Sequence, residues 1–484
     1  MIDQDAPAAT RKLSLVDYAF FVLETAERPM NVGPLFVLRP PPQRGRVRFA
    51  DRLYRRMLER PAGPPFNLRL QEVSLAGMPA LVPDADFDLA RHVHRITLRK
   101  PATIRTLLAK VCALHVRRLD RTRPLWELYV IDGLPNGQVA VYAKMHHGVV
   151  DGVGFVKIIA QWMSTSADDP EVRAMWEGVP VSTRASRAEG PLARDLDKWV
   201  RAGTGAARTA VAFARLLWQQ GRNTLGAGGG SPLPFVTTPP VLKVAPSARR
   251  SFAYCVLPFD EVKALGKSRD ATINDMLLTM LDIALRRYLD QAPGAAPRPL
   301  VADMPVALGG DGSQGNRIAL VQLPLGASDL SPVERLDAIV ARTRAVKQEL
   351  HTGSAEAAML HSILVHALPG LWEQMGWREA PMLANLVVSN PFGFPDKRFL
   401  MGAEIEVALP VSVVAPGQVL NITAVNVEDR YQIAFIAIAE GVLDVDLLAQ
   451  YTQEAFATLA SALGKKRRTR RTRGGTKSKQ KTTQ

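Results

Sequence analysis

The stretch KMHHGVVDGVG, residues 144–154, decides how the rest of the chain is interpreted. The residues before it, 138–145, are rich in β-forming side chains and partly alternate, which predicts a strand. The residues after it predict a helix, because apolar side chains recur at helical spacing at Phe155, Ile158, Ile159, Trp162 and Met163. We therefore expect a strand end, a tight turn and a helix start, carrying the pattern H-H-x-x-x-D-G.

The paired histidines His146 and His147 are candidates for proton transfer. The positive end of the following helix disfavours imidazolium, and a neutral histidine can accept a proton at pH 7. Neighbours on a strand point to opposite faces, so only one of the pair can face a given cleft. We assign His147 as the general base and His146 as its supporting residue. The alternative is two ordinary polar residues at a strand end; the doubled histidine, the Asp-Gly that follows and the strand–turn–helix context favour catalysis.

Asp151 and Gly152 complete the pattern. Asp151 follows His147 by four positions, across the turn. Its carboxylate can hold the turn shut by accepting backbone N–H groups or by pairing with an arginine. We expect Asp151 to act through the geometry of the turn.

These residues resemble a known family. The pattern H-H-x-x-x-D-G is the signature of the chloramphenicol-acetyltransferase-like, CoA-dependent acyltransferase superfamily, and it also occurs in the condensation domains of peptide synthetases. Further blocks resemble the bacterial wax ester synthase/diacylglycerol acyltransferases, in order along the chain: LSLVD at 13–17, PMNVG at 29–33, PLWE at 124–127, Asn274-Asp275, GNR at 315–317 and LNIT at 420–423. The chain departs from that family at Asn31, where histidine is frequent, and at SNPFGFP (389–395), which replaces an SNVPGP-like block.

The resemblance implies an α/β, two-lobed CoA-dependent acyltransferase fold, with mixed sheets, flanking helices and an interlobe tunnel that has the signature at its centre. Composition and pattern divide the chain accordingly. We expect an N-terminal lobe at 1–190, a helical and Gly/Pro-rich linker at 191–250, a C-terminal lobe at 251–464 and a disordered basic tail at 465–484.

The implied activity is O-acyl transfer from long-chain acyl-CoA to diacylglycerol, which makes triacylglycerol, and to long-chain alcohols, which makes wax esters. Transfer would be direct, without an acyl-enzyme and without a cofactor, since acyl-CoA is a substrate. By family analogy Asn274 supports the oxyanion or the acyl group; the alternative is that it merely caps its own helical turn. Pro124, Leu125, Trp126 and Asp275 are expected to be structural members of the motifs.

The sequence contains no motif typical of a serine hydrolase or of a metal-dependent hydrolase. Residues 311–315 (DGSQG) lack the first glycine of G-x-S-x-G, and neither HExxH nor a Cys/His cluster occurs, so no metal site is expected. His92 and His94 have no third ligand nearby, and we interpret them as a surface pair. The glycines at 226–230 follow no predicted strand, which excludes a nucleotide-binding loop.

The 484 residues carry a formal net charge of +15, with 47% hydrophobic and 22% charged residues. Residues 465–484 hold ten Lys or Arg and no acidic residue, which leaves the body at +5, so nucleic acid is not the expected partner. Two cysteines far apart fit a reducing compartment, and no apolar run is long enough to span a bilayer. We expect a cytoplasmic protein associated peripherally with an anionic membrane or lipid-inclusion surface.

Two further functions compete with lipid acylation. One is a condensation-like domain that uses carrier-protein thioesters, which the PLW, ND and LNIT blocks disfavour. The other is a non-enzymatic binder of nucleic acid, which explains only the tail. The predicted helix at 191–222, with an arginine every seven residues from Arg201 to Arg222, either lies on an anionic membrane or packs on the body as a linker.

Overall fold

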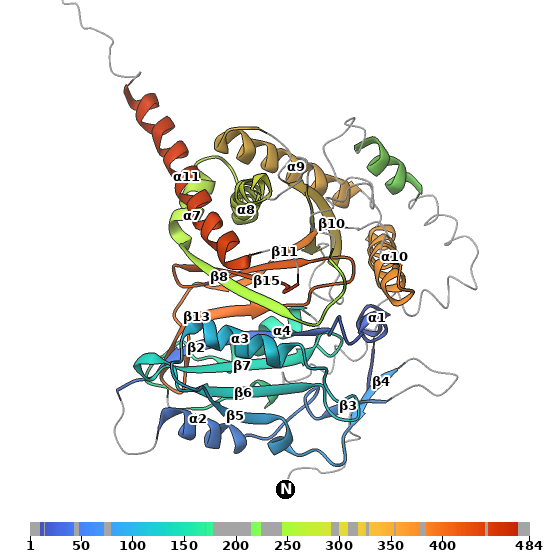
Figure 1. Cartoon of the computed structure of the whole chain (residues 1–484), viewed down its shortest axis with the longest axis vertical. Helices are drawn as coiled ribbons and strands as arrows, with labels where there is room; N and C mark the ends of the chain where they lie inside the picture. Colours follow the sequence, from blue (N-terminus) through green and yellow to red (C-terminus); the bar gives the residue numbers. More distant parts are fainter. Residues whose placement is uncertain are drawn as a thin grey trace, which may run out of the picture.

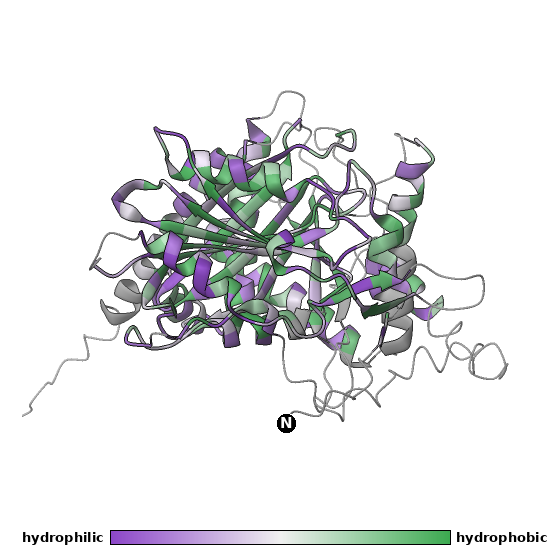
Figure 2. Cartoon of the chain, turned by 90° about the horizontal axis from the view of Figure 1, so that it is seen from below, coloured by the Kyte–Doolittle hydropathy of each residue, from purple (hydrophilic) through white to green (hydrophobic). Residues whose placement is uncertain are grey.

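The computed structural model describes residues 10–13, 15–42, 48–71, 79–150, 152–169, 171–177, 214–223, 244–291, 300–307, 318–325, 329–352, 355–377, 384–440 and 444–472. These residues form two lobes, each built on a six-stranded mixed sheet (Figure 1). Hydrophobic residues gather on the strands at the centre of the molecule (Figure 2). The predicted α/β, two-lobed architecture is confirmed.

The sheet of the N-terminal lobe has the order β12-β13-β2-β7-β6-β5. Its strands are β2 (Asn31–Arg39), β5 (Val93–Thr97), β6 (Trp126–Asp132), β7 (Val139–His146), β12 (Phe399–Leu400) and β13 (Ala403–Val411). All neighbours are antiparallel except β5 and β6. The central strand β7 is buried along its whole length, because both faces of the sheet are covered.

Helices and a small sheet surround this lobe. They are α1 (Leu15–Leu23), α2 (Phe49–Leu58), α3 (Ile104–His115) and α4 (Gly152–Trp162), with a three-stranded sheet of β1 (Arg11–Lys12), β4 (Ala80–Pro83) and β3 (Leu68–Gln71). Helix α3 packs between the lobes: its Leu107, Val111 and Leu114 belong to one apolar cluster with Tyr142 of β7 and Phe252 of the second sheet.

The sheet of the C-terminal lobe has the order β10-β9-β11-β14-β15-β8. Its strands are β8 (Arg250–Pro258), β9 (Leu300–Ala307), β10 (Ile318–Leu325), β11 (Leu386–Phe394), β14 (Leu420–Val427) and β15 (Arg430–Ile438). Helices α7 (Phe259–Lys267), α8 (Ile273–Asp290), α9 (Pro332–Thr352) and α11 (Val445–Thr472) lie on one side of it, and α10 (Ala355–Gln374) contacts β10 and α1 (Figure 1).

The two faces of the C-terminal sheet differ in polarity. The face toward α8, α9 and α11 is apolar, with Ala302, Leu323, Leu386 and Ile422 in one core. Alternation along the strands sends the intervening residues to the other face. The buried polar residues among these include Gln322, Asp303, Asn421 and Thr423.

The lobes are not contiguous in sequence as the boundaries 1–190 and 251–464 implied. Strands β12 and β13 leave the second half of the chain and extend the N-terminal sheet, where β13 pairs with β2 from Glu404↔Arg39 to Val411↔Gly33. Sequence alone missed β13, because its partner lies in the other half of the chain.

The last helix is also longer than predicted. We expected a disordered tail from residue 465, but α11 continues to Thr472 and includes the first part of that tail. Of the predicted helix at 191–222, residues 214–222 belong to a helix at 214–223; the remainder, and 473–484, lie outside the described residues.

Candidate active site

His147 follows the end of β7 and is held by the segment that precedes β2. Its backbone N–H donates to the Met30 carbonyl at 2.8 Å, and its ring stacks on Phe20 with centroids 4.0 Å apart. The side chain is half-buried, and its Nδ1 is enclosed without a hydrogen-bond partner. Burial lowers the pKa of His147 below its usual 6.5, against the opposing charge of Asp17. The lowered pKa favours a neutral His147 ring at pH 7.

His146 points elsewhere and is almost completely buried. Its Nδ1 accepts from the Gly148 N–H at 3.1 Å, which places the proton of the neutral ring on Nε2, 3.7 Å from Glu24 Oε1. Burial, together with the charge of Arg121, lowers the pKa of His146 to about 3. His146 Nδ1 therefore closes the turn onto Gly148, while its supporting role in the reaction stays a prediction.

Helix α1 forms the wall behind both histidines. Successive residues of this helix, Phe20 and Phe21, stack on His147 and His146 with centroids 4.0 and 4.1 Å apart. Gly148 lies so close to α1 that a Cβ there would be 2.5 Å from the Phe21 ring and 2.6 Å from the Asp17 carbonyl oxygen. Only glycine fits at this point of the turn. Sequence reasoning missed this wall, although adjacent phenylalanines on a predicted helix were a visible signal.

Glu24, just beyond α1, is a second residue that sequence reasoning missed. Its carboxylate is buried and receives Arg121 Nη2 at 3.0 Å and the Met30 N–H at 3.3 Å. The same carboxylate lies beside His146 Nε2. Glu24 thus fixes Met30, whose carbonyl holds His147, and the ring of His146 together.

Asn31, where this chain departs from the family pattern, binds the C-terminal end of helix α3 through its side chain. Its Nδ2 donates to the His115 carbonyl at 2.7 Å and to the Arg117 carbonyl at 3.1 Å. Lys144 donates to the Leu114 and Arg117 carbonyls, and its ammonium pairs with Glu127 at 2.6 Å. Both residues satisfy carbonyls that the end of a helix leaves free. Asn31 is therefore a structural tie between α3 and β2, which pairs with the strand of the turn at Asn31↔His146.

The PLW block, residues 124–126, contacts the backbone of the histidine turn. The carbonyl of Leu125 accepts the His146 N–H at 3.0 Å, and Pro124, Leu125 and Trp126 are buried. Trp126 donates through Nε1 to the Phe66 carbonyl at 2.7 Å.

The interpretation of His92 as a surface residue is wrong. Its ring is buried between Trp126 and Phe87, and its Nδ1 lies 2.8 Å from the Trp126 carbonyl. His92 precedes β5 instead of lying on it, so it does not share a strand face with His94. Within the described ranges, no group of three or more His, Cys, Asp or Glu side chains is placed to hold a metal ion.

Asn274 and Asp275 open helix α8 in the other lobe and have different surroundings. Asp275 forms a capping box with Thr272 and accepts the Thr343 hydroxyl at 2.6 Å, so the cap of this helix belongs to Thr272 and Asp275. The alternative that Asn274 caps its own turn is thereby excluded. Asn274 is exposed, and its Oδ1 accepts from Asn390 Nδ2 at 2.8 Å. No contact in the described part of the chain joins it to either histidine.

Gly152 begins α4, while Asp151 lies outside the described residues, so its role stays a prediction.

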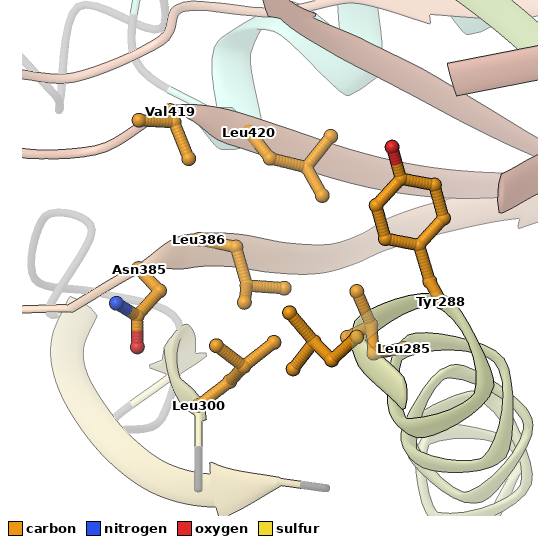
Figure 3. Close-up of a pocket in the computed structure, with 8 residues that line it drawn as sticks. Leu285, Tyr288, Leu300, Asn385, Leu386, Val419 and Leu420 are labelled. Atoms are coloured by element: carbon orange, nitrogen blue, oxygen red, sulfur yellow. The ribbon is translucent and has the colours of Figure 1, made fainter. Parts of the chain in front are cut away.

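A small apolar pocket, distinct from the histidine turn, lies between α8 and the C-terminal sheet (Figure 3). It is lined by Leu285, Tyr288, Leu289, Leu300, Asn385, Leu386, Val419 and Leu420.

Comparison with known proteins agrees with this architecture. Residues 13–277 match the wax ester synthase/diacylglycerol acyltransferase catalytic domain, and residues 314–460 match the WS/DGAT C-terminal domain. The chain belongs to the wax ester synthase/diacylglycerol acyltransferase family. This acyltransferase is 32% identical over 466 residues to a putative diacylglycerol O-acyltransferase of Mycobacterium tuberculosis, covering 93% of this chain and all of the other.

Solved structures place the fold of this acyltransferase in the same group. A wax ester synthase/diacylglycerol acyltransferase from Marinobacter aquaeolei superposes with a TM-score of 0.70 at 25% identity, covering 94% of this chain and 100% of that one. The starter condensation domain of rhizomide synthetase, in complex with C8-CoA, gives a TM-score of 0.54 at 14% identity, covering 94% and 95%. The second likeness shows a shared fold alone. The resemblance stated from the sequence is confirmed.

Proposed function

We propose that this acyltransferase moves a long-chain acyl group from acyl-CoA to the hydroxyl of diacylglycerol, or of a long-chain alcohol, with His147 as general base. The observation that carries the proposal is the half-buried, neutral imidazole of His147 at a turn fixed on every side. Because Nδ1 is enclosed, Nε2 is the ring atom that remains for a substrate. Family membership supports the reaction class, and the surroundings of His147 support its proposed role as the base.

The reaction then needs one base and no acyl-enzyme. His147 Nε2 takes the proton of the alcohol while the alcohol oxygen attacks the thioester carbonyl carbon. Collapse of the tetrahedral intermediate breaks the carbon–sulfur bond, and the departing thiolate takes the proton back from His147. The charge on the carbonyl oxygen needs a donor during this step. We propose Asn274 for it: its oxygen is occupied by Asn390, so its amide nitrogen is the group it can offer.

The deciding experiment is an assay of purified protein with palmitoyl-CoA against diacylglycerol and against hexadecanol, with lipid products resolved. Triacylglycerol, wax ester or both support the proposal, and their ratio names the acceptor. Free palmitate alone would show a hydrolase. Transfer only from a carrier-protein thioester would instead support the condensation-like alternative.

We also propose that the protein meets its lipid substrates at an anionic lipid surface. An apolar patch is formed by Val22, Leu368, Leu371, Met375 and Trp377, all exposed, with Met375 70% and Trp377 51% accessible. Leu368 and Leu371 share one face of α10, and Met375 directly follows the helix, where its N–H donates to the Leu371 carbonyl at 2.9 Å. Gln374 Nε2 donates to the Val22 carbonyl at 3.1 Å, which sets α1 beside them. From 367 to 377 the one charged residue is Glu373, and Arg28 neutralises it.

The patch adjoins the wall of the histidine turn, since both include α1. Large exposed apolar patches mark interaction sites, and a tryptophan at the rim suits the boundary of a lipid layer. Along the described residues, no helix is both long and apolar enough to cross a membrane.

The basic tail and the patch should contribute to vesicle binding in separable ways. Each basic residue near an anionic bilayer contributes about 1 kcal/mol within a Debye length of ~8–10 Å. Deleting residues 465–484 should therefore reduce co-sedimentation with phosphatidylserine vesicles in a salt-dependent manner. The double variant Leu371→Glu, Met375→Glu should reduce it at all salt concentrations.

Leu330→Glu is the matched control, because Leu330 is 38% exposed outside the patch. Its vesicle binding should equal that of the unaltered protein. Turnover of a detergent-dispersed acceptor should hardly change on tail deletion. Binding that withstands both the deletion and the double variant would remove the proposed lipid surface.

A further inference from the structure

The polar face of the C-terminal sheet contains a group of buried side chains that the proposed reaction leaves unused. Asp303 of β9 is fully buried and accepts from Gln418 Nε2 at 2.9 Å, and it pairs with His366 Nε2 of α10 at 2.7 Å. Gln322 of β10 stands directly opposite Asp303 in the antiparallel ladder and is 2% exposed. Side chains at such opposed positions lie on the same face, with Cβ atoms about 5 Å apart.

Several atoms in this group have no partner. They are Asp303 Oδ1, Gln418 Oε1, and both Oε1 and Nε2 of Gln322. An unpaired buried polar group costs free energy comparable to a lost hydrogen bond, so native proteins satisfy nearly all of them. Three acceptors and one amide donor in one place form a surface that suits an occupant rich in hydrogen-bond donors.

The neighbouring polar residues on the same face are satisfied within the protein. Asn421 donates to the Val413 carbonyl at 2.9 Å, and Thr423 donates to Asn421 Oδ1 at 2.8 Å. His366 is also fully engaged, since its Nδ1 lies 2.6 Å from the Ser362 carbonyl. Burial opposes the imidazolium of His366, but the charge and hydrogen bond of Asp303 outweigh it and raise its pKa. Unpaired atoms are not confined to this group, since Gln432 Nε2 of β15 also lacks a partner, but Asp303, Gln322 and Gln418 together hold four of them.

The group is joined to the histidine turn by a short path. Arg28 Nη1 donates to the Gln418 carbonyl at 2.8 Å, and two residues later the Met30 carbonyl holds the His147 N–H. These contacts link Gln418, and through its side chain Asp303, to the segment that holds His147.

We propose that Asp303, Gln322 and Gln418 form a subsite that binds the hydroxyl or amide N–H groups of a substrate during acyl transfer. The inference rests on the proposed function. Two substrates carry this chemistry: the pantetheine arm of acyl-CoA, with two amides and a hydroxyl, and the glycerol part of an acylglycerol. A simple long-chain alcohol has no second polar group to place there.

The test uses Gln322→Leu, which keeps the shape of the side chain while removing its unpaired atoms. Thr423→Val is the matched control, on the same face and equally buried but with a partnered hydroxyl. KM is measured for palmitoyl-CoA at fixed acceptor, and then for dioctanoylglycerol and hexadecanol at fixed palmitoyl-CoA. Loss of one or two uncharged hydrogen bonds should raise the affected KM roughly five- to tenfold.

The pattern of effects identifies the source. A rise for palmitoyl-CoA alone, matched by weaker binding of free CoA in calorimetry, assigns the subsite to pantetheine. A rise for dioctanoylglycerol but not hexadecanol assigns it to glycerol. Unchanged KM values with unchanged or increased stability would mean that ordered water fills the group, and the proposal would be lost. Calorimetry with CoA needs no turnover, so this result is separable from failure of the proposed reaction.

Discussion

His147→Ala should lower kcat for ester formation by about 10²–10⁴-fold, the usual contribution of a positioned general base. The half-buried ring stacks on Phe20, and its enclosed Nδ1 has no hydrogen-bond partner, so the fold should survive its removal. The measurement is product formation from palmitoyl-CoA, with circular dichroism and thermal unfolding as the check on folding.

His146 supplies the matched comparison. His146→Asn can still accept the Gly148 N–H and should retain more activity than His146→Ala, which should itself remain measurable. If folded His146→Ala and His147→Ala proved equally inactive, the assignment of base and support would be wrong.

The pH profile gives an independent check on His147. The neutral ring is the active form, and protonation occurs only below its pKa, which burial holds under 6.5. The acid limb of kcat/KM should therefore fall below pH 6.5. A limb centred above 6.5 would point to another ionising group.

Arg28→Leu should lower the free energy of unfolding by about 3 kcal/mol, because it leaves the largely buried Glu373 carboxylate without its cation. Arg28 Nη2 and Nε bind Glu373 at 2.7 and 3.0 Å, and the arginine side chain is only 2% exposed. This pair joins the segment before β2 to α10 in the other lobe. Activity should also fall, since the same segment supplies the Met30 carbonyl to His147. Urea unfolding measures the stability change.

Two variants separate the pair from general surface effects. Arg28→Met with Glu373→Leu removes both charges and should recover part of the loss, limited by the Gly417 N–H that Glu373 also binds. Arg39→Met breaks an ion pair with Glu404 in which the arginine is 57% exposed, and it should change stability little. A large loss for Arg39→Met, or none for Arg28→Leu, would contradict the assigned importance of burial.

Local signals in the sequence identified the elements that carry the site. The strand that leads into the paired histidines and the helix that follows them were both predicted, because each has a periodic apolar pattern beside a clear turn. The family motifs also separated the PLW block and Asp275 as structural, and their buried contacts agree with that.

Long-range contacts could not be predicted in the same way. His92 looked exposed, yet it is enclosed by Phe87, five residues earlier, and by Trp126 from another strand. Glu24 and Phe21 reach His146 only through the docking of α1. The polar face of the C-terminal sheet becomes visible only when Gln322 is set opposite Asp303. In each case, the partner is fixed by topology and not by spacing.

The return of β13 to the N-terminal sheet has a consequence for synthesis of the chain. Strand β2 has β7 on one side and β13 on the other, so it keeps one open edge until residue 411 has emerged from the ribosome. An open edge strand offers unpaired N–H and C=O groups to other chains. The first lobe is therefore translated long before it can close, and a nascent chain stalled before β13 is exposed to edge-to-edge aggregation.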